Sequence, residues 1–311
     1  MISEEMRKRI AALNRRDLKH DVETGDEERA TKPETPPRVS GKKREPIVDV
    51  PAIEPKDLQI VATAADARLR LTLKEVAPGE EIGNQAGQFL LIEKSIQALL
   101  HGGGGGFQER YECTIGALTA GLGDESFGKL SQVCPEDVIY VDIETTGLTA
   151  GTPLFLVGVL GYINGSLCIQ QLLARDYTEE PALLMHFSDM IKTSQIVVSF
   201  NGRSYDLPYI RDRSVFMGVP FQFHQAHIDM LHVARRRWKR RLPNCKLQTL
   251  EQYICKRVRR GDIPGAEIPD AYHRFVQTGN AVQMRDILHH NALDLLTTAE
   301  ILIFILEGRD L

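Results

Sequence analysis

The stretch YVDIETTGL, residues 140–148, places two carboxylates inside an apolar run. It predicts a central β-strand, and residues two apart on a strand point to the same face of the sheet. Asp142 and Glu144 therefore share one face. Burying two adjacent carboxylates is costly unless cations neutralise them, and oxygen ligands of this kind are preferred by Mg²⁺ and Mn²⁺. The alternative interpretation is that the strand ends here and that both acids are solvated.

The chain around this stretch predicts an α/β domain over residues 136–308. Two more strand-like runs, 154–163 and 166–174, follow at short spacing and indicate an antiparallel meander. A buried strand over 196–200 comes after a predicted helix, and the rest is mainly helical, ending in a long helix over 282–306. This order is typical of a mixed sheet, with a meander and added parallel strands, flanked by helices.

The residues before this domain divide into two parts. Residues 1–55 predict a short amphipathic helix followed by a disordered, proline-bearing linker. Residues 56–135 are expected to form a small β-rich segment with strands over 68–76 and 87–96. The glycine run 102–106 is interpreted as a flexible loop that leads into a third strand, rather than as a phosphate cradle.

The composition favours a globular protein of the cytoplasm. Hydrophobic residues make up 42% of the 311 residues, enough for a sizeable core. The five cysteines form no C-x-x-C pair, which indicates neither a disulfide framework nor a zinc site. The N-terminus is charged from the fourth residue, unlike a signal peptide, and the apolar run 301–306 is too short to cross a bilayer. We therefore expect no membrane association, and the oligomeric state stays open.

The net charge of −4 conceals a basic segment, which we define as residues 234–260. It contains eleven Lys or Arg residues and one acid, Glu251. A local excess of positive charge on an acidic protein indicates an anionic partner, most simply a nucleic-acid backbone. Arg236 and Arg240 are the candidate backbone contacts, with a solvated helix as the alternative. Trp238, the single tryptophan, could stack on a base or pack in the core.

Further carboxylates follow the first pair along the chain. Asn201 closes the buried strand and Asp206 lies at the expected start of the next helix, where it could cap the helix or join a site at the strand ends. Asp294 lies in the middle of the long helix, where it can cap nothing. A solvent-facing position is the alternative for Asp294. Asp229 is expected either to support a site or to serve as a capping or surface residue.

Taken together, these motifs resemble the DEDD 3′–5′ exonuclease superfamily of ribonuclease H-like proteins. The D-x-E-T motif matches residues 142–145, and N-x-x-x-[FY]-D matches residues 201–206. A histidine shortly before Asp294 matches the third motif. Three other segments resemble the YprB-type branch of that superfamily more closely, namely CKLQTLEQYI (245–254), GDIPGAEIPDAYHRFVQTGN (261–280) and HNALD (290–294).

The resemblance implies a ribonuclease H-like fold and a metal-dependent nuclease that acts on single-stranded DNA or RNA, most simply from the 3′ end. It implies a catalytic site in which Asp142, Glu144, Asp206 and Asp294 bind two divalent cations, Mg²⁺ or Mn²⁺. We expect the substrate to be contacted by Thr145, Leu148, Asn201, Tyr205, Arg236 and Arg240.

The doubled histidine before Asp294 offers two candidates for a catalytic general base. Members of the superfamily place the base five residues before the last Asp as His, or four residues before it as Tyr; these are the positions of His289 and His290. On a continuous helix at about 100° per residue, His290 lies roughly 40° from Asp294 and His289 roughly 140° away. No Pro or Gly interrupts residues 282–294, so we expect His290 to face the site.

Two other functions stay open from the residues alone. The first is a nucleic-acid-binding module of the same fold without catalytic activity, against which the complete set of carboxylates argues. The second is a nucleotide-binding loop over residues 123–130, which match most of G-x-x-x-x-G-K. That motif is incomplete because Leu130 stands where the magnesium-binding Ser or Thr would be.

Overall fold

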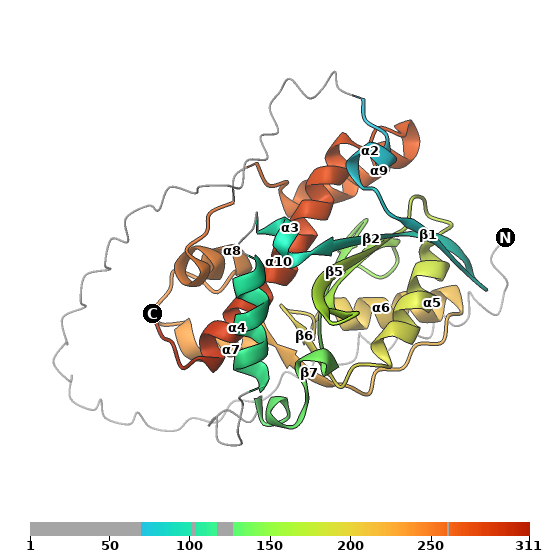
Figure 1. Cartoon of the computed structure of the whole chain (residues 1–311). Coiled ribbons are helices and arrows are strands. Elements are labelled where there is room, and N and C mark those ends of the chain that lie inside the picture. The colour runs from blue at the N-terminus through green and yellow to red at the C-terminus, as the bar shows by residue number, and fades with distance from the viewer. Residues whose placement is uncertain (1–69, 101–103, 117–126, 260) are drawn as a thin grey trace, which may run out of the picture. The chain divides into compact units, whose positions relative to one another are not determined.

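The computed structural model describes residues 70–100, 104–116, 127–259 and 261–311, with a seven-stranded sheet at its centre (Figure 1). The predicted helix and linker over residues 1–55 lie outside the described residues. The strands are β1 (Glu80–Asn84), β2 (Gly87–Ser95), β3 (Val138–Thr145), β4 (Leu154–Ile163), β5 (Ser166–Leu173), β6 (Ile196–Ser199) and β7 (Ala226–Asp229). The α-helices are α2 (Leu73–Val76), α3 (Ile96–Leu99), α4 (Gly104–Gly116), α5 (Glu180–Ile191), α6 (Asp206–Met217), α7 (Met230–Trp238), α8 (Leu247–Leu250), α9 (Ile268–Thr278) and α10 (Val282–Leu306). Short helical turns are η3 (Leu130–Gln132), η4 (Pro135–Asp137), η5 (Glu251–Cys255) and η6 (Gly265–Glu267).

The strand order is β1-β2-β5-β4-β3-β6-β7. The pairs from β1 through β3 in this order are antiparallel, whereas β3 pairs with β6, and β6 with β7, in parallel. The predicted mixed sheet, a meander with added parallel strands, is therefore confirmed. The parallel pairing brings the carboxyl ends of β3, β6 and β7 to one edge of the sheet, where α/β proteins commonly assemble their sites.

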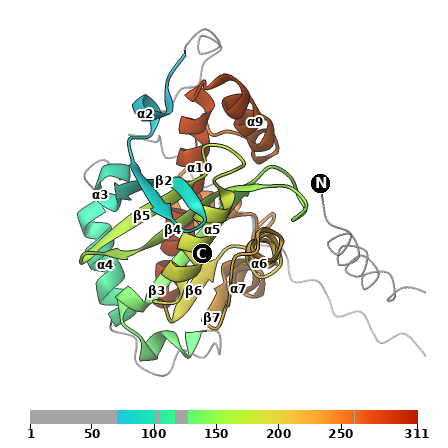
Figure 2. The same cartoon turned by 90° about the vertical axis from the view of Figure 1, so that its right-hand side faces the viewer.

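Helices cover both faces of the sheet because its central strands are apolar on both sides (Figures 1 and 2). Alternate residues of β3 belong to different core clusters. Val138 and Tyr140 pack in one cluster with residues of α4 and α10, whereas Val141 and Ile143 pack in another with residues of α5 and α6. Asp142 and Glu144 follow the alternation of Val138 and Tyr140, so they point toward α10.

The long helix α10 has the bounds that its apolar pattern predicts, residues 282–306. Most of its side chains are buried, because it packs against β3, β4, β5 and β6 as well as against other helices. Within the described parts of the chain, no helix combines the length and apolar character needed to cross a bilayer.

The segment before β3 is less rich in strands than the sequence predicts. The strand expected over residues 87–96 is confirmed as β2, which pairs with β5 and extends the same sheet. The strand expected over residues 68–76 is wrong in its described part, because α2 begins after Thr72. Thr72 and Glu75 form a capping box, a local signal that prevails over the alternation of apolar residues.

The described part of the glycine run, Gly104–Gly106, also differs from the predicted loop, whereas Gly102 and Gly103 lie outside the described residues. Helix α4 begins at Gly104 and continues to Gly116, where a third strand was expected. Its apolar residues Phe107, Tyr111 and Ile115 recur every four residues and are all buried. This helical spacing, rather than the glycines, determines the local structure.

Candidate functional site

Four carboxylates from three elements meet at the edge of the sheet where β3 and β6 end. Asp142 and Glu144 lie on β3, Asp206 is the first residue of α6, and Asp294 lies in the middle of α10. Asp206 and Asp294 each raise the pKa of Asp142 and of Glu144 by their negative charge, which shows that the four acids are electrostatic neighbours. The structure thus brings together the acids that the sequence singled out.

The turn between β6 and α6 holds Asp206 in place. Asn201 has a φ of 69°, and its backbone N–H donates to Asp229 Oδ1 at 3.0 Å. The backbone N–H of Arg203 donates to Asp229 Oδ2, also at 3.0 Å. A Cβ atom on Gly202 would lie 2.3 Å from Ser199 Oγ and 3.2 Å from Asp206 Oδ2, so this turn requires glycine. Asp229 also caps α7, which confirms the capping role considered for it.

Three of the four acids, Asp142, Glu144 and Asp206, are partly or fully buried without an ion-pair partner among the described residues. Burial, together with the neighbouring carboxylates, raises the pKa of Asp142 and of Glu144 well above the usual range. Burial raises the pKa of Asp206 to about 7, although backbone hydrogen bonds at Asp206 and Ile143 oppose the shift. Among the described residues, no Lys or Arg forms an ion pair with any of these three. Such a cluster is costly unless a cation joins it.

Asp142 is held by a buried network that the motifs did not predict. Asn291 Nδ2 donates to Asp142 Oδ2 at 2.8 Å, and Gln171 Nε2 donates to Asn291 Oδ1 at 2.9 Å. Gln171 Nε2 also donates to the backbone carbonyl of Leu288 at 2.7 Å. Sheet register places Gly158 opposite both Asp142 and Gln171, and a Cβ atom there would lie 2.1 Å from Asn291 Oδ1. Asn291 therefore occupies the space that Gly158 leaves.

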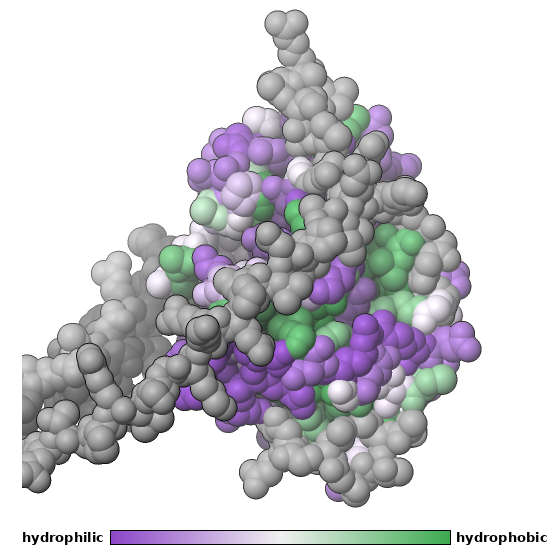
Figure 3. Space-filling view, turned by 90° about the vertical axis from the view of Figure 1, so that its left-hand side faces the viewer, coloured by the Kyte–Doolittle hydropathy of each residue, from purple (hydrophilic) through white to green (hydrophobic). Residues whose placement is uncertain are grey.

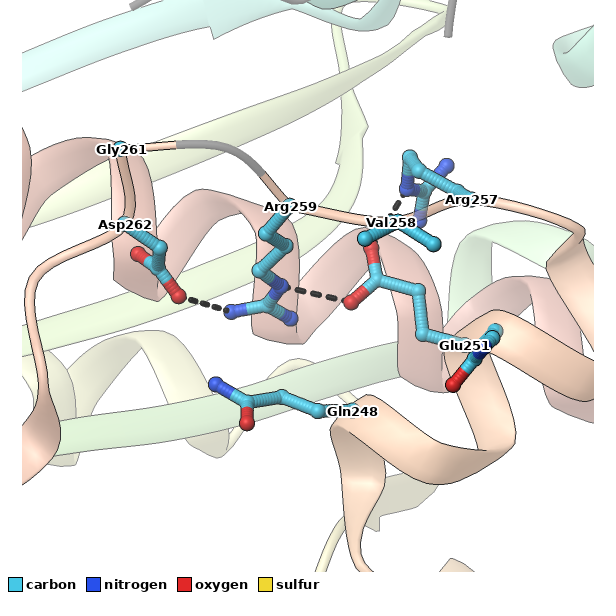
Figure 4. Close-up of a pocket in the computed structure, with 8 residues that line it drawn as sticks. Gln248, Glu251, Arg257, Val258, Arg259, Gly261 and Asp262 are labelled. Carbon is cyan, nitrogen blue, oxygen red and sulfur yellow. Dashed lines mark hydrogen bonds and ion pairs between the residues drawn. The ribbon is translucent and has the colours of Figure 1, made fainter. Parts of the chain in front are cut away.

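Asp294 forms an ion pair with Arg259, and three acids bind the guanidinium of Arg259. Arg259 Nη2 lies 2.5 Å from Asp294 Oδ1. Arg259 Nε donates to Glu251 Oε2 at 2.6 Å, and Nη1 donates to Asp262 Oδ2 at 3.2 Å (Figure 4). Both Arg259 and Glu251 are buried, and Glu251 is also bound by Arg257 at 2.5 Å. The lone acid in the basic segment was the sequence signal that could have identified this ion-pair network.

The two histidines occupy different environments. His290 Nε2 lies 3.6 Å from Asp294 Oδ2, and His290 Nδ1 is hydrogen-bonded to Asp262 Oδ1 at 2.9 Å. Burial alone would lower the pKa of His290, but Asp262 and Asp294 outweigh burial and raise it. Burial and the charge of Lys94 lower the pKa of His289 to about 4. His290 therefore lies beside Asp294, as helical geometry predicts, while the contribution of Asp262 was not foreseen.

The predicted substrate contacts in the first two motifs form a second group beside the acids. Thr145 Oγ1 donates to the backbone carbonyl of Gly147 at 2.7 Å and lies 2.9 Å from the Tyr205 hydroxyl. Leu148 follows in the same loop and is 88% exposed. The loop thus presents an apolar side chain to solvent next to the acids.

The basic segment divides into an exposed part and a buried part. Arg236 and Arg240 are exposed. A broad hydrophilic band crosses one side of the molecule (Figure 3). Of the two alternatives for Trp238, packing in the core is confirmed, because its ring is fully buried with its centroid 6.3 Å from that of Phe304. Ten residues of helix separate Phe304 from Asp294, roughly 15 Å at 1.5 Å per residue. The ring of Trp238 therefore packs against a part of α10 distant from Asp294.

The residues present suit a divalent cation by their chemistry. Within the described residues, no three His, Cys, Asp or Glu side chains are already arranged as a ready metal-binding group. Asp142, Glu144 and Asp206 nevertheless form a buried, uncompensated set of oxygen donors, which Mg²⁺ and Mn²⁺ prefer. Asp294 is available to a cation only as a ligand shared with Arg259.

Parts of the chain are similar to known proteins. The model of the RNase H superfamily matches residues 139–305. A Bacillus subtilis (strain 168) protein named YprB, described as uncharacterized, is 30% identical over 165 residues, which are 52% of this chain and 40% of that protein. The chain thus spans two fifths of the length of this curated relative. A family B DNA polymerase from Pyrobaculum calidifontis aligns at 16% identity with a TM-score of 0.43, over 53% of this chain and 24% of the polymerase.

Proposed function

Because the chain belongs to the RNase H superfamily and contains a YprB-type RNase H-like domain, we propose that it is a metal-dependent nuclease. It hydrolyses phosphodiester bonds of single-stranded DNA or RNA, most simply as a 3′–5′ exonuclease with a two-metal mechanism. The observation that carries this proposal is the meeting of Asp142, Glu144, Asp206 and Asp294 at one edge of the sheet. The 3′ polarity rests on the resemblance of the motifs.

Asp142, Glu144 and Asp206 would hold the divalent cations, Mg²⁺ or Mn²⁺, with Asp294 as a shared ligand. When bound, these ions supply positive charge that lowers the pKa of water and stabilises the leaving oxygen. Asn291 donates to Asp142 Oδ2 and so leaves Asp142 Oδ1 for a cation. This support from a buried amide fixes the orientation of one ligand before any cation arrives.

His290 takes the role of general base in this proposal. If its Nδ1–H donates to Asp262, the lone pair of Nε2 is directed toward Asp294 and the other acids. A neutral histidine in this tautomer can accept a proton from the attacking water. Asp262 then acts as a positioning residue, because it fixes the tautomer and stabilises the protonated ring.

The strand itself would be held by two separated groups. Thr145, Tyr205 and the exposed Leu148 lie next to the acids, together with Asn201 in the β6–α6 turn. The exposed Arg236 and Arg240 would contact the phosphate backbone farther along the strand.

One degradation assay tests this function. End-labelled single-stranded DNA and RNA are incubated with the parent protein and with Asp206→Asn in Mn²⁺. We expect degradation by the parent and none by the variant, because Asn is a weaker, uncharged ligand. Equal degradation by both proteins would refute the site, whereas binding without degradation by the parent would favour a non-catalytic binding module.

A further inference from the structure

A pocket of about 280 Å³ opens beside Arg259, the ion-pair partner of Asp294, between α8 with η5 on one side and residues 257–259 and 261–262 on the other (Figure 4). Gln248, Gln252, Val258, Arg259 and Asp262 are among the residues that line it. Its volume is close to the lower limit of about 300 Å³ for small-molecule sites, so it is suited to a ligand the size of a single ring system. None of these five residues is among the predicted substrate contacts.

Two glutamine side chains, Gln248 and Gln252, line this pocket. Gln248 and Gln252 are four residues apart, which places them on the same side of one helical turn, and both are exposed. In the described part of the chain, neither side chain has a hydrogen bond. Figure 4 shows the Gln248 side chain directed into the space below Arg259 and Asp262. Val258 is 49% exposed and adds an apolar surface.

The guanidinium of Arg259 lies between the pocket and Asp294. Arg259 bonds to Glu251 and Asp262, which line the pocket, and the same guanidinium contacts Asp294. Asp262 in turn bonds to His290. A nucleotide whose phosphate lies at the acids could therefore extend its base into the pocket.

The charges of the pocket favour a base over a second phosphate. Its buried cations, Arg257 and Arg259, are already engaged with Glu251, and Arg259 also with Asp262. What remains to bind a ligand are the two neutral amides, each with one acceptor and two donor hydrogens. Such a group matches the adjacent donor and acceptor atoms on the edge of a nucleobase.

We propose that this pocket binds the base of a nucleotide adjacent to the bond that is cleaved, with Gln248 and Gln252 contacting the edge of that base. The inference rests on the proposed nuclease function and extends it to a base-binding subsite. The guanidinium of Arg259 separates this base from the reacting phosphate and keeps the two at a fixed spacing.

A double-mutant cycle between protein and substrate tests the subsite. The probes are single-stranded oligonucleotides with an abasic nucleotide at the last, second-last or third-last position from the cleaved end. The kcat/KM for the first cleavage is measured in Mn²⁺ for the parent, for the Gln248→Ala and Gln252→Ala double variant, and for Gln277→Ala. Gln277 is an exposed glutamine on α9 and serves as the matched control.

At one position, the missing base should lower kcat/KM of the parent and of Gln277→Ala by on the order of 10-fold, as expected for loss of a well-placed amide–base contact. On the intact probe, kcat/KM of the double variant should be lower than that of the parent by the same factor. On the probe that is abasic at that position, kcat/KM of the double variant should fall no further. If the effects of base removal and of the two substitutions multiply at every position, the subsite is refuted while the nuclease function stands. If the parent cleaves no probe, the nuclease function is refuted, and the subsite with it.

Discussion

Gly158→Ala should impair the site although residue 158 carries no functional group. The added Cβ would lie 2.1 Å from Asn291 Oδ1 and 2.7 Å from its Cγ and Nδ2. Asn291 is fully buried, so it cannot rotate into solvent to relieve the clash. It must leave the position from which it joins Gln171 to Asp142.

The cost can be worked from the bonds that would be lost. The hydrogen bond from Asn291 to the Asp142 carboxylate is worth about 1.5–3 kcal/mol, and the neutral bond from Gln171 to Asn291 about 0.5–1.5 kcal/mol. Alanine also restricts the unfolded chain at residue 158, which stabilises the folded protein by about 0.4–1 kcal/mol. The free energy of unfolding should therefore fall by roughly 1–4 kcal/mol. Because Asp142 loses its orienting bond, kcat/KM should fall by about 100-fold, the order expected for a 1 Å misplacement.

Gly161→Ala on the same strand is the matched control. A Cβ on Gly161 would lie 3.1 Å from Ile139 Cγ2, with its next neighbours at 3.9 Å. Urea unfolding and oligonucleotide cleavage are measured for both variants. Gly161→Ala should lose less than about 1 kcal/mol of stability and keep its activity. If both variants equal the parent in free energy of unfolding and in kcat/KM, Asn291 does not orient Asp142.

Three further predictions follow from the histidines and the exposed arginines. His290→Ala should lower kcat about 10²–10⁴-fold in a cleavage assay, as loss of a general base does, whereas His289→Ala should leave kcat within a few-fold; the reverse order would refute the assigned base. Because the pKa of His289 is lowered to about 4, its protonation favours the unfolded chain, and the parent loses stability as the pH falls from about 6.5 toward 4. His289→Gln removes this loss. In urea unfolding, the free energy of unfolding of the variant minus that of the parent should therefore increase by on the order of 1–2 kcal/mol as the pH is lowered from about 7 to 5. A difference that does not change with pH would contradict the lowered pKa of His289. The double substitution of Arg236 and Arg240 by Ala should weaken binding to all sequences alike and reduce the salt dependence of Kd by about two ion contacts, as measured by titration at several salt concentrations; an unchanged slope would refute backbone contact.

The elements that carry the four acids could be predicted because their signals are local. The apolar runs around Asp142 and Glu144 are long enough to specify a strand, and the strands after them are separated by short turns. The uninterrupted helix around Asp294 has no Pro or Gly in its interior, so its angular positions could be worked out from the sequence. Local signals failed where two were in conflict, as at Thr72, where a capping box prevailed over strand-like alternation.

The support around the acids could not be predicted because it depends on sheet register. Gly158 and Gln171 become neighbours of Asp142 only when β4 and β5 pair in the observed alignment. A glycine in a strand indicates that something approaches closely, but not what approaches. Asn291 was visible as a polar residue on an apolar helix, yet its partners lie 120 and 149 residues away.

Charge counting had the same limitation in the basic segment, because Arg257 and Arg259 are bound by an acid of this chain and not by an external anion. Arg257 and Arg259 turn inward because Glu251, the one acid there, is buried and needs compensation. Arg259 then extends to Asp294, so part of the positive charge that resembles a nucleic-acid contact in sequence instead neutralises the site. Removing Glu251 would leave both guanidinium groups short of a partner, a loss that costs about 3–5 kcal/mol for a broken buried pair. Glu251, the acid within the basic segment, thus helps to hold the guanidinium of Arg259 beside Asp294.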